Sequence, residues 1–351
     1  MHFNKISRRD FLKVAGVTAA SMSLAACGGN GSSTAGSTAA SGSTGAVANT
    51  GETYEINIGH INDERDSWHE GSLKFKEYVE ANSNGQISCT IYPNSQLGPE
   101  VDMIQNILSE GGLAITYTGE SMQTYEPDLG MIGMPYLIQS DEQMEKVLTG
   151  APGEKFASLM ESAGMKVLGY FTRGPRYITS VKKLTCVADC KNLVIRTPQS
   201  AMTVAAFEAI GAKPTPMALS EVFTSLQQGT IEAQENPLAM IQTQSFYEVC
   251  DYLILTAHLR AWVYIAIGKS IYDKLPDDLK KVVDDGAAEA QAYEHELFLD
   301  NEENYYNQLQ EEGMEFVEVD QQEFADAMIA GVMEVLTDSQ KQIYEEISAL
   351  A

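Results

Sequence analysis

The sequence predicts an α/β protein of two domains, and three observations support this fold class. The chain has 351 residues with a hydrophobic fraction of 44%, which is enough for two cores of ordinary size. From residue 54 onward, short apolar runs typical of strands alternate with longer stretches whose apolar residues recur at helical spacing. This alternation favours a largely parallel sheet covered by helices.

Residues 1–26 are expected to be an export and lipoprotein signal that lies outside the fold. Arg8 and Arg9 precede an apolar core, Val14 to Ser23, that is too short to cross a membrane, a pattern typical of a twin-arginine signal. The general export route stays open as an alternative. The run Leu24-Ala25-Ala26-Cys27 resembles a lipobox, which makes Cys27 the predicted site of lipid attachment.

Residues 27–53 are predicted to form a flexible tether. Gly28 to Gly51 consist almost entirely of Gly, Ser, Thr and Ala, with no charged and no aromatic residue. Such a segment has too little apolar surface to bury a core. With a lipid on Cys27, the folded part would be exported and anchored to the outer face of the cytoplasmic membrane, which is the periplasm in a Gram-negative cell.

The first domain is expected to comprise residues 54–173 and about 262–300. Ser67 and Glu70 form a capping box at the start of the first helix, and Pro99 precedes the second helix. Alternating or continuous apolar runs predict the strands at Tyr54–Ile58, Ile87–Ile91 and Ala114–Tyr117.

The second domain is expected to comprise residues 174–261 and about 301–351. Just before this domain begins, a strand at Lys166–Phe171 is expected to end at a loop, Thr172–Arg176, which crosses the boundary. Apolar runs at Tyr252–Leu255 and Trp262–Ile267 predict strands that return to the first domain. A helical stretch from about Asp277 to Glu312 would be roughly 50 Å long.

Arginine and asparagine side chains are expected where two strands end. The apolar run Leu193 to Ile195 delivers Arg196, and a second run closes on Glu235-Asn236-Pro237. In open α/β sheets, ligands bind outside the carboxyl ends of the strands, and an arginine fork fits a carboxylate. We therefore expect a receptor for a small anion. The alternative is that Arg196 and Arg176 form structural salt bridges with acidic residues.

Four linked motifs carry a resemblance to a known family: Ile195-Arg196-Thr197-Pro198, Gly211 to Met217, Ser220-Glu221-Val222 and Gln234 to Pro237. In this order they resemble the DctP family, the extracytoplasmic solute receptors of tripartite ATP-independent periplasmic (TRAP) transporters. The resemblance continues at Tyr92 to Gly98 and at Met134 to Leu137, so it covers most of the chain from about Tyr54 onward.

The resemblance implies a clamshell like that of periplasmic binding proteins, with crossover strands and a long C-terminal helix that spans both domains. Its interdomain cleft would bind a small organic acid, such as a uronate, a sialate or a C4-dicarboxylate, for delivery to TRAP membrane subunits. Arg196 would hold the carboxylate, Arg176 of Gly174-x-Arg176 would support it, and Asn236 would donate a hydrogen bond. Arg173, which precedes the glycine, fits the family pattern less well.

Glu120 and Ser121 follow the third predicted strand, where the family often contacts its ligand. A carboxylate at Glu120 would accept hydrogen bonds from ligand hydroxyls, and the alternative is a solvated loop carboxylate. Met217 is a candidate for an apolar wall of the cleft. The same applies to three aromatic residues, each of which is otherwise expected in the core: Phe171, Phe223 and Trp262.

Composition and motifs argue against other functions. A net charge of −26 disfavours nucleic acid as a partner. No cofactor motif, zinc spacing or nucleophile motif is present, so no cofactor, no metal and no enzyme activity are predicted. A receptor for a signalling system or an ABC importer stays an alternative, as does a twin-arginine-exported enzyme. Cys186 and Cys190 are expected either as a disulfide or as free thiols.

Overall fold

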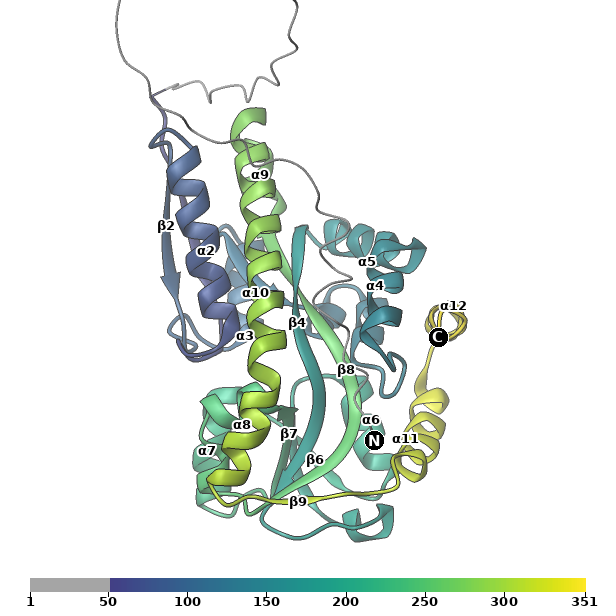
Figure 1. Cartoon of the computed structure of the whole chain (residues 1–351). Helices are drawn as coiled ribbons and strands as arrows, with labels where there is room; N and C mark the ends of the chain where they lie inside the picture. The colour runs from purple at the N-terminus through teal and green to yellow at the C-terminus, as the bar shows by residue number, and fades with distance from the viewer. Residues whose placement is uncertain (1–50) are drawn as a thin grey trace, which may run out of the picture. The chain divides into compact units, whose positions relative to one another are not determined.

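A nine-stranded sheet runs through residues 51–351, which are the residues that the computed structural model describes (Figure 1). Its strand order is β2-β1-β3-β8-β4-β7-β5-β6, and β9 pairs with β8. The predicted signal at 1–26, Cys27 and most of the predicted tether lie outside the described residues. The α/β fold class predicted from the sequence is confirmed for the described part of the chain.

One end of the sheet is formed by three parallel strands, as predicted. β1 (Tyr54–Gly59) lies between β2 (Ile87–Tyr92) and β3 (Ile115–Thr118). The connecting helices are α2 (Ser67–Asn82) and α3 (Glu100–Leu108). The carboxyl ends of β1 and β3 consequently lie at the same edge of the sheet.

The predicted capping box at the start of α2 is wrong. Asp66 is the N-cap, and its side chain accepts a hydrogen bond from the backbone N–H of Trp68. Ser67 is already helical, and its hydroxyl donates to Glu294 of the long helix at 2.8 Å. Both Asp66 and Ser67 are cap-forming residue types, so the cap lies one residue earlier than the pattern suggests.

Two long antiparallel strands form the middle of the sheet. β4 (Met165–Ser180) pairs with β8 (Tyr252–Gly268). The prediction of a strand that ends at Phe171 before a loop is wrong, and so is the division of β8 into two strands. The register is interrupted near Gly174 and Pro175, yet the strand continues beyond them. This continuation places Arg173 and Arg176 inside the sheet.

The other end of the sheet repeats the parallel arrangement. β5 (Val194–Thr197) lies between β6 (Lys213–Pro216) and β7 (Ala233–Pro237). β7 also pairs with β4 in antiparallel fashion, as β3 does with β8. The sheet is therefore mixed, and the largely parallel sheet predicted from the sequence holds only for its two ends. The helices here are α6 (Ala201–Ala209), α7 (Leu219–Gln227) and α8 (Leu238–Thr243).

Helix α10 (Asp277–Glu311) confirms the predicted long helix. Its 35 residues correspond to about 50 Å, and it packs against α2, β4 and α8 (Figure 1). Gly286 allows the close approach to α2, because a Cβ there would lie 2.7 Å from Val79 Cγ1. Within residues 51–351, no helix is both long and apolar enough to cross a membrane.

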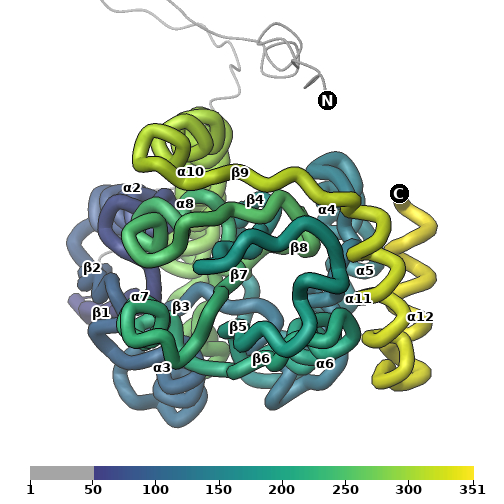
Figure 2. Tube along the Cα trace, turned by 90° about the horizontal axis from the view of Figure 1, so that it is seen from below, coloured from purple at the N-terminus to yellow at the C-terminus, as the bar shows by residue number. Residues whose placement is uncertain are grey.

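The remaining helices lie around this framework. α11 (Gln321–Val335) packs against α6, as Figure 2 shows from below. The others are α4 (Asp141–Thr149), α5 (Ala151–Ser162), α9 (Lys269–Lys274) and α12 (Asp338–Ser348), and the short strand β9 spans Glu315–Val317. The domain boundaries expected from the sequence stay a prediction.

Candidate functional site

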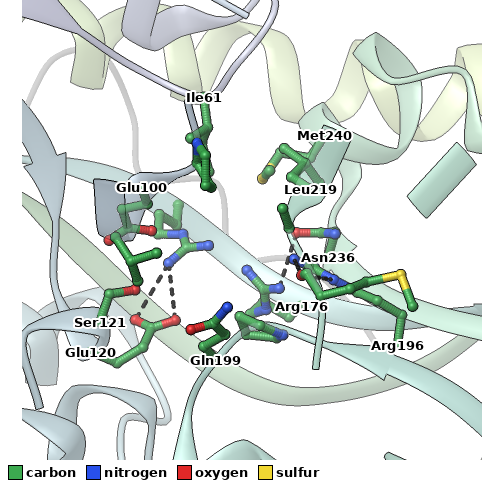
Figure 3. Close-up of a pocket in the computed structure, with 16 residues that line it drawn as sticks. Ile61, Glu100, Glu120, Ser121, Arg176, Arg196, Gln199, Leu219, Asn236 and Met240 are labelled. Carbon is green, nitrogen blue, oxygen red and sulfur yellow. Dashed lines mark hydrogen bonds and ion pairs between the residues drawn. The ribbon is translucent and has the colours of Figure 1, made fainter. Parts of the chain in front are cut away.

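A pocket lies where the carboxyl ends of strands from both ends of the sheet meet (Figure 3). Ile61 follows β1, Glu120 follows β3, and Arg196 and Asn236 stand near the ends of β5 and β7. The lining also contains Pro99, Glu100, Val101, Ser121, Arg173, Arg176, Pro198, Gln199, Met217, Ala218, Leu219 and Met240. All five pocket residues predicted from the sequence, Arg196, Arg176, Asn236, Glu120 and Met217, are therefore brought together.

Arg196 is buried without a carboxylate partner among the described residues. Its Nε and Nη2 donate to the backbone oxygen of Met217 at 3.0 and 2.8 Å, and the residue is 5% exposed. Burial lowers the pKa of Arg196 to about 10, which leaves it protonated at neutral pH. The structural salt bridge considered for Arg196 is not formed within residues 51–351, so the pocket contains a positive charge without an ion-pair partner.

Arg176, in contrast, does form a buried ion pair. Its Nε and Nη2 donate to Glu235 Oε2 at 2.5 Å and Oε1 at 2.7 Å, and Nη2 also donates to Asn236 Oδ1 at 2.9 Å. Burial opposes the ionisation of Glu235, but the nearby Arg176 charge outweighs it and lowers the pKa of Glu235 to about 2. Arg176 Nη1 is buried with no partner among the described groups. The alternative of a structural salt bridge is thus confirmed for Arg176, which still lines the pocket.

His258 extends this ion pair away from the pocket. Its Nε2 lies 3.1 Å from Glu235 Oε2, and its Nδ1 lies 2.8 Å from Thr256 Oγ1. Burial lowers the pKa of His258, so a neutral ring donates to Glu235 at neutral pH. The sequence offered no signal for this contact, because β8, which carries His258, does not pair with β7.

Asn236 is held in place by two hydrogen bonds. Its Oδ1 accepts from Arg176, and its Nδ2 donates to Gln234 Oε1 at 2.5 Å. The residue is 1% exposed and lines the pocket. Since an amide NH₂ has two hydrogens, one remains for a further acceptor.

Glu120 is buried, and the alternative of a solvated loop carboxylate is wrong. It is 4% exposed, and both of its carboxylate oxygens lie 3.5 Å from Arg173 Nη1. The Arg173 guanidinium also lies over the Trp68 ring, 5.8 Å from its centroid. Sequence reasoning gave Arg173 little weight because it precedes the glycine of the family pattern.

Glu100, at the start of α3, is a second acidic group in the pocket, and unlike Glu120 it was not predicted from the sequence. Its Oε1 accepts from the Thr118 hydroxyl at 2.7 Å. Burial, followed by the nearby Glu120 carboxylate, raises the pKa of Glu100. Figure 3 shows Glu100, Ser121 and Glu120 grouped together, with Arg196 and Asn236 on the other side of the pocket.

Met217 contributes to the pocket wall and also binds Arg196 through its backbone oxygen. The three aromatic candidates do not line the pocket. Phe171 packs on Tyr117 with ring centroids 4.8 Å apart, and Trp262 packs on Phe156 at 6.0 Å, so both belong to the core. Ile61, Leu219 and Met240 supply apolar lining that no sequence motif indicated.

Cys186 and Cys190 are both free thiols in this structure. Within residues 51–351, no three His, Cys, Asp or Glu side chains are grouped so that they would hold a metal ion.

Two family models match the sequence. Residues 58–341 match the DctP model, described as bacterial extracellular solute-binding protein, family 7. Residues 5–25 match the twin-arginine translocation signal.

Solved structures and a curated relative resemble the chain over most of its length. A TRAP periplasmic solute binding protein of Roseobacter denitrificans with bound L-galactonate is 37% identical, with a TM-score of 0.82 over 84% of this chain and 99% of its own. One from Haemophilus influenzae with bound L-gulonate is 29% identical, with a TM-score of 0.79 over 85% and 99%. The C4-dicarboxylate-binding periplasmic protein of Rhodobacter capsulatus is 28% identical over 80% of this chain and 83% of its own.

Proposed function

The chain belongs to the DctP family and is an exported solute receptor of the TRAP class, and we propose that it binds its organic acid through Arg196. The family consists of binding proteins, so no bond is made or broken. The acid would then pass to the membrane subunits of the transporter.

The observation that carries this proposal is the buried charge of Arg196, which has no carboxylate partner in the described part of the chain. Burying a charge costs several kcal/mol unless a partner compensates it. A ligand carboxylate would supply that partner, and a charge-assisted hydrogen bond contributes about 1.5–3 kcal/mol. Nε and Nη2 are held by Met217, which fixes the plane of the guanidinium for the incoming anion.

Arg176 and Asn236 are proposed as supporting donors. Arg176 Nη1 has no partner among the described groups, and Asn236 has one amide hydrogen to spare. Because Glu235 already neutralises Arg176, Arg176 would contribute a hydrogen bond and little net charge. Met217 would form part of the apolar wall beside the ligand.

Glu120 is proposed to accept hydrogen bonds from ligand hydroxyls, which makes a sugar acid the favoured ligand. Glu120 is buried at the pocket and is not fully engaged by Arg173, since 3.5 Å exceeds the usual hydrogen-bond length. The binding of L-galactonate and L-gulonate by two similar proteins supports this choice.

Two further proposals concern the whole molecule. Residues 54–173 with about 262–300, and 174–261 with about 301–351, would close over the ligand as two domains, which would exclude water and strengthen the charge contacts. A lipid on Cys27 would anchor the receptor to the outer face of the cytoplasmic membrane, with the tether at 27–53 between anchor and fold.

Thermal melting of the exported protein tests the ligand proposal. The panel would contain L-galactonate, D-glucuronate, N-acetylneuraminate, succinate and pyruvate, with Arg196→Ala beside the wild type. An acid at one hundred times its Kd stabilises the protein by about 2.7 kcal/mol, which is seen as a shift of a few degrees. The control is Arg260→Ala, because Arg260 pairs with Asp141 and does not line the pocket. We expect at least one acid to shift the melting temperature of the wild type and of this control, and none to shift that of Arg196→Ala. No shift with any acid would contradict the proposal, provided that native mass spectrometry finds no copurified ligand.

A further inference from the structure

The pocket contains a second arginine whose surroundings differ from those of Arg196. Arg173 lies on β4 with its side chain 9% exposed, and it faces Glu120 and not a backbone oxygen. Its Nε is buried and has no partner within the described part of the chain. The Trp68 ring below the guanidinium restricts its position. Arg173 is therefore a fixed donor group with unused hydrogen-bonding capacity.

The charged groups of the pocket divide into two ends. At one end, Arg196 has no ion-pair partner within residues 51–351, and Arg176 is neutralised by Glu235. At the other end, Arg173 faces Glu120, and Glu100 stands close by with a hydroxyl partner, Thr118. This second end thus contains two carboxyl groups and one guanidinium, so it has no positive charge to spare.

We propose that Arg173, Glu120 and Glu100 form a hydroxyl-recognition end that selects a polyhydroxylated monocarboxylate and rejects a dicarboxylate. This inference rests on the proposed function, because it takes Arg196 as the anchor of the single carboxylate. Glu120 and Glu100 accept hydrogen bonds from ligand hydroxyls, and Arg173 donates to a hydroxyl oxygen while it offsets the Glu120 charge.

A second carboxylate at this end would meet two carboxyl groups in a buried site. Like charges in such a site repel, and only protonation or displacement would relieve the repulsion. A hydroxyl at the same position has a hydrogen to donate and no charge to bury. Burial and the neighbouring Glu120 carboxylate raise the pKa of Glu100, as expected where two carboxyl groups lie close together in a buried site.

Titration calorimetry with matched acids tests the proposal. L-Galactonate and galactarate differ only in that a terminal hydroxymethyl group is replaced by a carboxylate, and D-gluconate and D-glucarate form a second pair that differs in the same way. We expect the wild type to bind at least one monocarboxylate 100-fold more tightly than its dicarboxylate partner. Glu120→Gln removes one negative charge, so it should bind the dicarboxylate at least tenfold more tightly than the wild type does. A misfolded variant would not show such a gain.

Arg173→Gln provides the complementary test. The variant lacks the Arg173 charge, so Glu120 is left without an ion-pair partner in the pocket. We therefore expect at least tenfold weaker binding of the monocarboxylate. Arg173→Lys, which restores a positive charge, should recover part of the affinity. The control Arg260→Gln removes an arginine that pairs with Asp141 outside the pocket, and it should bind like the wild type.

The inference would be overturned by equal wild-type affinity for both members of each pair, by wild-type affinity for the monocarboxylate in Arg173→Gln, by no gain in dicarboxylate affinity in Glu120→Gln, or by no binding of any of the four acids. If the wild type bound a dicarboxylate tightly and Arg196→Ala did not, only this inference would be overturned, because Arg196 would still bind a ligand carboxylate as proposed. If Arg196→Ala still bound both the monocarboxylate and the dicarboxylate as tightly as the wild type does, the proposed function itself would be contradicted.

Discussion

Arg176 and Glu235 form a two-point ion pair inside the protein, with N–O distances of 2.5 and 2.7 Å and side-chain exposures of 1% and 0%. This pair connects β4 to β7 beside the pocket, and His258 contacts Glu235 from β8. Arg176 is consequently part of the framework as well as of the lining. Arg196 forms no such pair within residues 51–351, which is why the ligand carboxylate is proposed to bind there.

Removal of the Glu235 charge should destabilise the fold. Glu235→Gln would leave Arg176 buried without its counter-charge, and breaking a buried pair from one side costs about 3–5 kcal/mol. Urea unfolding monitored by circular dichroism would measure the loss. Arg196→Gln serves as the comparison and should cost much less, because no ion pair is broken. Equal losses in the two variants would contradict the assigned difference between the arginines.

Arg196→Lys should weaken ligand binding while the fold is retained. Lysine keeps the positive charge but lacks the planar fork, so we expect an affinity loss on the order of 10- to 100-fold, equivalent to about 1.4–2.8 kcal/mol. Calorimetric titration with the acid found in the melting panel would measure it, with Arg260→Lys as control. Wild-type affinity in Arg196→Lys would show that geometry at this position is unimportant.

The stability of the protein should fall as the pH rises from 6 toward 8 because of Glu294. Burial raises the pKa of this carboxyl to about 8, whereas in the unfolded chain it is near 4.3. The folded protein therefore holds the proton more tightly, and the stabilisation is lost as the pH rises through the folded pKa. Two pH units at about 1.4 kcal/mol each give a loss of about 2–3 kcal/mol.

Glu294→Gln isolates this effect, because the amide can still accept from Thr172 N–H and donate to the Ser67 hydroxyl. Because the variant lacks this ionisation, its stability relative to that of the wild type should rise by about 2–3 kcal/mol between pH 6 and pH 8, as measured by chemical denaturation. A parallel loss of stability in the wild type and the variant would contradict the assignment to Glu294.

Gly286→Val should loosen the contact of α10 with α2. A Cβ at Gly286 would come within 2.7 Å of Val79 Cγ1 and 3.3 Å of Tyr78 Cδ1. Overpacking of this kind costs about 1–3 kcal/mol. Ala288→Val, at an exposed position of the same helix, is the matched control and should cost well under 1 kcal/mol. Equal melting temperatures of the two variants would show that the contact contributes little.

The elements that the sequence predicted best are those with strong local signals. The apolar run before Arg196 and the motif Gln234 to Pro237 identified β5 and β7, and the helix after Pro276 was predicted to within one residue. The placement of Arg196 and Asn236 near strand ends followed directly, because parallel neighbouring strands end at the same edge of a sheet.

The features that the sequence did not reveal depend on contacts between distant segments. β4 continues through Gly174 and Pro175 because its pairing with β8 outweighs the local turn signal, and only this continuation places Arg173 at the pocket. Glu235 stood within a recognised motif, yet its pairing with Arg176, 59 residues away, depends on the β4–β7 register. Likewise, the burial of Glu120 follows from the fold and has no signature of its own.

A crystal structure of the complex with whichever acid stabilises the wild type would test the central claim most directly. We predict that both carboxylate oxygens lie within about 3 Å of donors that include the Arg196 guanidinium, and that ligand hydroxyls face Glu120 and Arg173. A complex whose carboxylate binds Arg173, with Arg196 still bound only to Met217, would contradict the account.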